Sequence, residues 1–345
     1  MDLDIALILT QDGITNGAIY ALLAMALVLV FAVTRVVFIQ QGEFVAYGAL
    51  TLAMIQNNIV PATIWMLIVM GAAVTCFRLV QALRQGHLRG GLSVALWNVA
   101  YPVALGVSLF ALPLADLPMV VQVALTLAVV VPIGPLMYQL AYQPIASAPV
   151  LILLIVSVAV HISMVGLGLL FFGAEGFRTN AFSDAFFEWG PMLVSGQTIW
   201  VILTSVVLII ALYQFFDRTI YGKALKATAI NRVGARLMGI APSLAGKLTF
   251  MLAAFIGALS GILIAPITTV YYDTGFLIAL KGFVAAIIGG LASYPLAAVG
   301  AIVVGLLEAF SSFWASAYKE VIVFTLIIPV LLWRSLKSHH VEDDE

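Results

Sequence analysis

The sequence predicts an all-α polytopic membrane protein with about 9–11 transmembrane spans, some of them broken or re-entrant. Of the 345 residues, 63% are hydrophobic and only 9% are charged, and the mean hydropathy is +1.16. A soluble domain carries about a quarter charged residues, so soluble packing cannot hide this much apolar surface. The apolar runs are long and continuous, which excludes the alternating strands of an outer-membrane barrel. A net charge of −1 gives no indication of nucleic-acid binding.

Turn signals and charged residues divide the chain into about eleven candidate spans. Three of them are short or rich in glycine and can also be half-helices or re-entrant segments: 43–60, 278–294 and 320–334. The first thirteen residues carry acids and no bases, so we expect the first span to be retained rather than cleaved as a signal peptide. The other candidates are 10–34, 63–83, 93–112, 119–141, 149–173, 197–216, 247–266 and 296–314.

The basic residues predict the orientation, because loops on the cytoplasmic side carry an excess of Lys and Arg. With the N-terminus outside and the C-terminus inside, twelve of the fifteen Lys and Arg residues fall on the cytoplasmic side. Arg178 and Lys319 fall outside, and Lys281 lies near or within the membrane. The loop 174–196 is then expected to be extracytoplasmic.

The loop 217–247 holds six of the fifteen Lys and Arg residues and is the longest stretch expected in the cytoplasm. A helix is predicted between Gly222 and Gly239, with Asn231 as an N-cap and Gly239 as its stop. The loop is either an ordinary basic loop or a docking helix, and its exposed apolar residues favour docking. The residues expected to take part are Gly222, Lys223, Lys226, Asn231, Arg232, Ala235, Arg236, Leu237 and Gly239.

Several polar residues within apolar runs are candidates for a substrate path, because buried polar groups in a bilayer are costly. Glu43 either lines such a path or caps a helix and pairs with Arg35. Lys281 extends to the interface, neutralises a carboxylate such as Glu308, or binds a substrate anion. The full set of candidates is Asn16, Tyr20, Gln40, Gln41, Gly42, Glu43, Lys281 and Glu308.

No catalytic motif is present. The chain has no Walker A pattern, Ser/His/Asp set, paired catalytic carboxylates, dinucleotide fingerprint or HEXXH motif. His161 has no second ligand nearby in the sequence, so a metal site is not expected, and the single Cys76 excludes a disulfide framework. The sequence therefore predicts a protein that is not an enzyme and needs no cofactor.

Three stretches carry a resemblance to a known family. Residues 16–50 are similar to an opening span and its Gly-Glu segment, 221–240 to a coupling loop, and 280–309 to a C-terminal signature that contains Lys281 and Glu308. Together they resemble the first of the two membrane permease subunits of branched-chain amino-acid ABC importers, the hydrophobic amino-acid uptake group.

The resemblance implies a single transmembrane permease domain over 1–345 in a bacterial-type inner (plasma) membrane. The implied partners are a second homologous permease subunit, two cytoplasmic ABC ATPase subunits and an extracytoplasmic solute-binding protein. ATP hydrolysis would occur on the ATPase subunits, with helix 222–239 in a groove of one of them. The cargo would be branched-chain amino acids or a related small solute.

The chain also departs from the family pattern. The family usually reads Asn-Phe-Ala-His before Gly-Glu, whereas residues 38–41 here read Phe-Ile-Gln-Gln. Residues 63–112 look like an extra pair of spans, and Asn231 replaces a usual acid. An ion-coupled secondary transporter is the alternative, and it would need an essential carboxylate such as Glu43 or Glu308. An intramembrane enzyme is a further alternative, and it would need a set of reactive residues that the sequence does not show. A purely structural membrane subunit is another, and it would not transport any solute.

Overall fold

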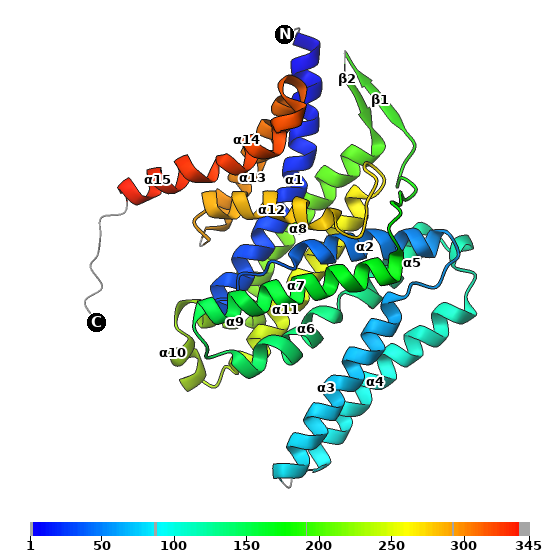
Figure 1. Ribbon diagram of the computed structural model, residues 1–345, viewed down its shortest axis with the longest axis vertical. Helices are drawn as coiled ribbons and strands as arrows, with labels where there is room; N and C mark the ends of the chain where they lie inside the picture. The colour runs from blue at the N-terminus through cyan, green and yellow to red at the C-terminus, as the bar shows by residue number, and fades with distance from the viewer. Residues whose placement is uncertain (1–2, 86–87, 191, 292, 338–345) are drawn as a thin grey trace.

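The computed structural model describes residues 3–85, 88–190, 192–291 and 293–337, and within them the chain is almost entirely helical (Figure 1). The first half contains α1 (Leu3–Thr34), α2 (Gln41–Gln56), α3 (Thr63–Gln85), α4 (Leu88–Ala111), η1 (Leu114–Asp116), α5 (Met119–Val130), α6 (Ile133–Met137), η2 (Tyr138–Tyr142), η3 (Gln143–Ile145) and α7 (Val150–Phe172). The second half contains β1 (Phe186–Trp189), β2 (Met192–Ser195), α8 (Gly196–Arg218), α9 (Ile220–Ile230), α10 (Arg232–Leu237), α11 (Pro242–Ile264), α12 (Thr274–Ile288), α13 (Tyr294–Trp314), η4 (Ser316–Tyr318), α14 (Lys319–Thr325) and α15 (Ile327–Lys337).

The predicted fold class is confirmed. Within the described residues, seven helices are long and apolar enough to cross a membrane, and two shorter apolar helices cover Trp97–Ala111 and Thr274–Ile288. The three doubtful candidates are all short helices. The first is the 16-residue α2, the second is the 15-residue α12, and the third is divided into α14 and α15. Because a straight span needs about 20 residues, none of these three crosses a bilayer alone.

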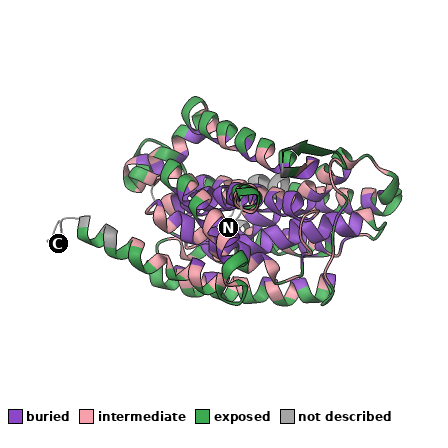
Figure 2. Cartoon of the chain, turned by 90° about the horizontal axis from the view of Figure 1, so that it is seen from above, coloured by how far each residue is buried: buried purple, intermediate pink, exposed green. Residues whose placement is uncertain are grey.

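Helix α1 is the axis of the molecule. Of the most apolar 18-residue stretch of α1, 89% is buried inside the protein, whereas 17% of the corresponding stretch of α7 is buried. It packs against α8, α11, α12 and α13, and Figure 2 shows the buried residues gathered around it with exposed residues on the outer helices. The contact with α13 is close because both helices carry glycine there. A Cβ on Gly305 would lie 2.3 Å from the carbonyl oxygen of Gly13.

The two short helices α2 and α12 cross each other inside this bundle. A Cβ on Gly42 would lie 2.4 Å from the carbonyl oxygen of Gly275, and one on Gly275 would lie 1.9 Å from that of Gly42. Only glycine permits two helix starts to approach this closely. Helix α11 packs equally tightly on α2, with the position of a Cβ on Gly261 only 1.9 Å from the Val45 carbonyl oxygen. Both short helices are thereby held inside the protein.

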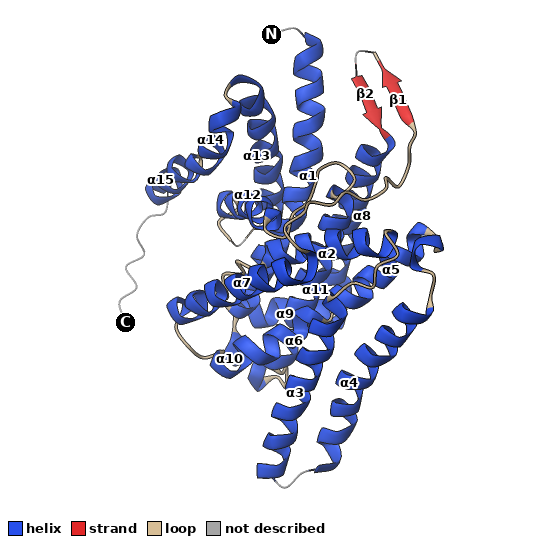
Figure 3. Ribbon diagram, turned by 45° about the vertical axis from the view of Figure 1, so that its right-hand side comes forward, coloured by secondary structure: helices blue, strands red, loops and turns tan. Residues whose placement is uncertain are grey.

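Helices α3 and α4 form a hairpin that extends from the main body, away from the N-terminus (Figures 1 and 3). They pack on each other near Gly71, whose Cβ position would lie 2.3 Å from the Asn98 carbonyl oxygen. The outer surface of the hairpin is apolar and includes Trp65, Phe77 and Trp97 among its exposed side chains. This hairpin covers the predicted extra pair of helices at 63–112.

The connection 174–196 contains the two strands of the structure, which the sequence analysis did not predict. Strands β1 and β2 pair antiparallel, with Phe186 opposite Ser195, and Gly190 turns between them at φ 64°. Phe177 forms a backbone bridge with Val270, so the connection is docked on the segment between α11 and α12. The hairpin stands at the same end of the molecule as the N-terminus (Figure 1).

The predicted single helix over 222–239 is wrong. The chain forms two helices here, α9 and α10, because Asn231 adopts an extended conformation at φ −145°. The Asn231 side chain accepts a hydrogen bond from the Gly234 backbone N–H at 2.8 Å, which confirms it as the N-cap of α10. Gly239 ends α10 at φ 84°, as the sequence indicates for a stop glycine.

The α1–α13 contact predicts unequal effects of two Gly→Ala substitutions. Gly305→Ala places a methyl group against the α1 backbone and should lower the free energy of unfolding by about 1–3 kcal/mol. Gly166→Ala is the matched control, because nothing lies within 4 Å of its Cβ position. It should leave stability unchanged or raise it, since alanine favours a helix. Thermal unfolding in detergent measures both. Equal midpoints for the two variants would contradict this packing.

Candidate functional site

The start of α2 is a polar segment buried in the interior. The chain leaves α1 at Thr34, reverses through residues 35–40, and begins α2 at Gln41. Gln40, Gln41 and Glu43 have exposed fractions of 0%, 0% and 1%. Polar side chains at this depth need partners from the protein, because hydrocarbon offers none.

The two glutamines are anchored by neighbouring helices. The Gln40 amide donates to the Tyr142 hydroxyl and lies 3.5 Å from the Met137 sulfur. The Gln41 amide donates to the Ala253 carbonyl of α11 at 3.1 Å. The side-chain oxygens of both glutamines have no hydrogen-bond partner among the described residues. Each glutamine therefore retains one free acceptor in the interior.

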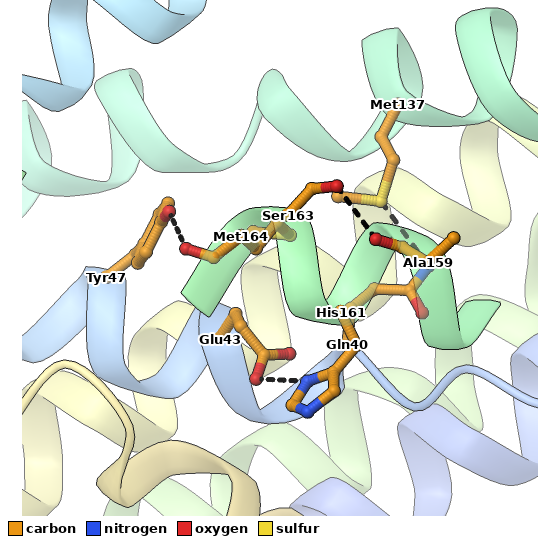
Figure 4. Close-up of polar contacts among 8 residues, drawn as sticks. All are labelled: Gln40, Glu43, Tyr47, Met137, Ala159, His161, Ser163 and Met164. Atoms are coloured by element: carbon orange, nitrogen blue, oxygen red, sulfur yellow. Dashed lines mark hydrogen bonds and ion pairs between the residues drawn. The ribbon is translucent and has the colours of Figure 1, made fainter. Parts of the chain in front are cut away.

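Glu43 forms an ion pair with His161 of α7 (Figure 4). Its Oε1 lies 2.8 Å from Nδ1 of His161, and its Oε2 has no partner among the described residues. One turn further along α2, the Tyr47 hydroxyl donates to the Met164 carbonyl at 2.7 Å and fixes α2 to α7. The alternative in which Glu43 pairs with Arg35 is wrong, since Arg35 is exposed and Glu43 is not.

The starts of two helices meet beside this carboxylate. Gly42 and Gly275, which touch, are the second residues of α2 and α12. The N-cap residues of the two helices, Gln40 and Asp273, make no side-chain capping hydrogen bond. The N-terminal end of a helix carries a partial positive charge and free N–H groups, so this point favours negative charge. Glu43 lies at this point, where the helix starts stabilise a negatively charged carboxylate.

An apolar pocket of about 200 Å³ adjoins the site. It is lined from α1, the reversal 35–40, α7 and α12, and Phe38 and Phe276 form part of its wall. The ring of Phe276 lies 4.5 Å from the ring of His161, so one aromatic side chain separates the pocket from the ion pair. The region combines a buried carboxylate, an imidazole and an apolar space.

A second polar cluster lies further along α12. Lys281 Nζ is 2.5 Å from Glu308 of α13 and 3.4 Å from Glu320 of α14. The Tyr20 hydroxyl of α1 donates to Glu308 at 2.5 Å, and its ring lies 5.9 Å from the ammonium. Lys281 follows Gly275 by six residues, so about 9 Å of helix axis separates the two clusters.

These contacts decide some of the predictions. Lys281 does not extend to the interface, because its side chain is buried and paired with Glu308 as the second interpretation predicted. Asn16 lies one turn from Tyr20, half-buried, with no hydrogen bond to a described residue. Sequence reasoning missed two partners, His161 and Glu320. His161 had a signal, since a lone imidazole in an apolar span is unusual. No group of three or more His, Cys, Asp or Glu among the described residues is arranged to bind a metal.

The predicted docking residues divide into inward and outward groups. Gly222 and Ala235 are buried, and the Arg232 guanidinium donates to the Ala146 carbonyl at 3.0 Å. Lys226 is 3.7 Å from Asp217. The outward group comprises Lys223, Lys226, Asn231, Arg236, Leu237 and Gly239, which are exposed. Arg232 therefore contacts the main body, whereas Arg236 is exposed.

Residues 9–331 match the family described as "Branched-chain amino acid transport system / permease component". This chain belongs to that family. Together with the apolar helices, the match identifies a multi-pass protein of the bacterial inner membrane. The alternative of an ion-coupled transporter is not favoured.

Similar proteins carry the same description. The permease component is 30% identical over 206 residues to the high-affinity branched-chain amino acid transport system permease protein LivH of Escherichia coli (strain K12), covering 56% of this chain and 65% of that protein. It is 31% identical over 145 residues to BraD of Pseudomonas aeruginosa, a permease of the same description, covering 41% and 47%. The chain thus spans about two-thirds of the length of the first relative. No solved structure matches.

The lysine cluster predicts that its members contribute unequally to stability. Lys281→Met leaves two carboxylates near each other without their cation and should lower stability by about 3–5 kcal/mol. Glu320→Gln should cost about 1 kcal/mol or less, because its side chain is 35% exposed. Thermal unfolding of the purified permease component compares the two. A smaller loss for Lys281→Met than for Glu320→Gln would contradict the arrangement.

Proposed function

We propose that this permease component is the membrane subunit of an ATP-driven importer that moves branched-chain amino acids or a related small solute inward. The ATP is hydrolysed on separate ABC ATPase subunits, a second homologous permease completes the pore, and a solute-binding protein delivers the cargo outside. The family match and the names of the relatives support this proposal. In this arrangement the N-terminus and loop 174–196 are extracytoplasmic, and the C-terminus is cytoplasmic.

The observation that carries the proposal is an apolar surface on α9 and α10, which connect the spans α8 and α11. Ile230, Val233, Leu237 and Met238 are between 70% and 86% exposed there. Residues 219–241 lie outside the helices that are long enough to cross a membrane. Large apolar side chains clustered in water mark a protein interface. A soluble subunit is therefore proposed to cover this surface.

The contacts of α10 supply a route from that surface to the buried site. Arg232 holds the Ala146 carbonyl just before α7, and α7 carries His161. On its other side α10 leads directly into α11, whose Ala253 carbonyl holds Gln41. A displacement of α10 therefore acts on two helices that hold the start of α2. An ATPase with different affinities for two positions of α10 would shift the permease between two states.

The start of α2 is the proposed centre of the substrate path. An amino acid carries an ammonium and a carboxylate, and the free Oε2 of Glu43 is an acceptor suited to the ammonium. The helix starts at Gly42 and Gly275 suit the carboxylate. The adjoining apolar pocket suits an aliphatic side chain. The Lys281 cluster, with Tyr20 and Glu308, is proposed to border the same path.

Leu237→Glu tests the docking surface. The Leu237 side chain is 83% exposed, so the change should not affect folding. It places a charge in an apolar interface and should weaken association with the ATPase by about 2 kcal/mol, or roughly thirtyfold. Leu193→Glu, on the β hairpin at the opposite end and 64% exposed, is the matched control. Co-purification from membranes measures both. Equal ATPase recovery with Leu237→Glu and Leu193→Glu would refute docking on α10.

Glu43→Gln tests the substrate path. Glutamine keeps the size of the side chain and can still bond His161, but it removes the charge opposite the ammonium. Uptake should fall by about tenfold or more, because a hydrogen bond to a charged group contributes about 1.5–3 kcal/mol. The initial uptake rate by proteoliposomes with the partner subunits is the measurement. Asp116→Asn, an exposed acid on η1, is the control and should leave uptake unchanged. Full uptake by Glu43→Gln at every substrate concentration would remove Glu43 from the path.

A further inference from the structure

A polar pocket lies where the α3–α4 hairpin meets the main body. Its volume is about 200 Å³, and it lies between the second half of α3 and the short helices η2 and η3. The side chains that line it and matter here are Val74, Phe77, Arg78, Gln81, Gln139 and Gln143. The chain continues from η3 to Ala146, which Arg232 of α10 contacts, so the pocket lies at the same end as α9 and α10. In the proposed orientation this end is cytoplasmic.

Arg78 occupies this pocket without an anionic partner. It is half-buried and donates to the side-chain oxygen of Gln139, which is neutral. Gln139 in turn donates to the Pro135 carbonyl at 3.1 Å, so the amide is fixed in that orientation. Among the described residues, no carboxylate lies within ion-pair distance of Arg78. A guanidinium has five N–H donors, and among the described residues Gln139 is the side chain that accepts from Arg78.

A second cation lies close to the first. Lys247, near the start of α11, is half-buried and close enough to Arg78 for the two charges to repel each other. No acid in the described part of the chain pairs with Lys247 either. Two like charges held together at reduced dielectric are unfavourable unless an anion joins them. Lys247 does not line the pocket, but it adds positive charge near Arg78, which does.

The surroundings favour an anion that also has an apolar part. Gln81 and Gln143 bring amide donors to the pocket, and Val74 and Phe77 bring apolar surface. The adjoining face of α3 is apolar and open, with Phe77, Val80 and Leu83 at 57%, 45% and 60% exposure. Apolar side chains on a membrane helix at this exposure contact lipid chains. A phosphate in the pocket could thus remain attached to acyl chains that lie along α3.

We propose that this pocket binds the headgroup of an anionic phospholipid. The phosphate accepts hydrogen bonds from Arg78 and the glutamine amides, Lys247 adds attraction, and the acyl chains cover the apolar face of α3. Basic pockets between helices on the cytoplasmic side suit anionic headgroups, and that leaflet is rich in them. The lipid would then connect the α3–α4 hairpin to η2, η3 and α11. The site is separate from the proposed substrate path and does not depend on the transported solute.

Lipid binding to the purified full-length protein, measured by native mass spectrometry and by the thermal midpoint, tests the proposal. Phosphatidylglycerol should bind and raise the midpoint more than phosphatidylcholine, and inorganic phosphate should do neither. Arg78→Gln and Lys247→Gln should each weaken phosphatidylglycerol binding by about fivefold, and the double variant by about twenty-fivefold. Arg218→Gln is the matched control, because it removes an exposed cation at the end of α8 and should bind like the unaltered protein.

Arg78→Lys separates a folding defect from a binding defect, because it keeps the charge and should retain most of the affinity. Four results would overturn the proposal. The first is equal binding of the two lipids, and the second is unchanged affinity in the double variant. The third is an equal loss in Arg218→Gln, which would show attraction to surface charge in general. Inorganic phosphate that competes with the lipid would also overturn it, because the site would then recognise the free anion.

Discussion

The structure depends on one constraint, which is that the polar start of α2 must be satisfied inside the protein. A helix that begins at a membrane surface can leave its first N–H groups and polar side chains to water. Helix α2 begins among α7, α11 and η2, where an unsatisfied polar group costs several kcal/mol. Those elements therefore supply the Tyr142 hydroxyl, the Ala253 carbonyl and the His161 ring. Of the polar atoms there that have no partner among the described residues, Oε2 of Glu43 is the one we assign to a solute.

The same constraint explains why α12 is short and why the glycines are where they are. Helix α12 starts against α2 at Gly275 and ends near α13, and in between it places Lys281 against Glu308 and Tyr20. The bundle around α1 thus holds two helices of 16 and 15 residues, each with a polar group in the interior. Irregular backbone within a membrane is tolerated where protein or a cavity surrounds it, and binding sites of transporters form at such breaks.

The helical architecture follows from the composition of the sequence, but the contacts between polar side chains that are far apart in the sequence do not. Apolar run length predicted about eleven spans, of which seven are helices long enough to cross a membrane within the described residues. Asn231 and Gly239 predicted a helix start and a helix end that the structure confirms. Asn231 alone could have corrected the prediction of one helix over 222–239. An N-cap marks the start of a helix, so an N-cap at residue 231 implies that a new helix begins there. Glu43 and His161 are 118 residues apart, and no local pattern reports such a contact. The β hairpin was missed because its four-residue strands are shorter than any periodic signal.

In the proposed function, this permease component moves solute only when a separate ATPase acts on α9 and α10. Uptake of a labelled branched-chain amino acid by proteoliposomes, prepared with and without the ATPase subunits, tests it most directly. We expect uptake only when the ATPase, ATP, the partner permease and the solute-binding protein are all present, with no response to a proton or sodium gradient. Uptake by this chain alone under an ion gradient would contradict it.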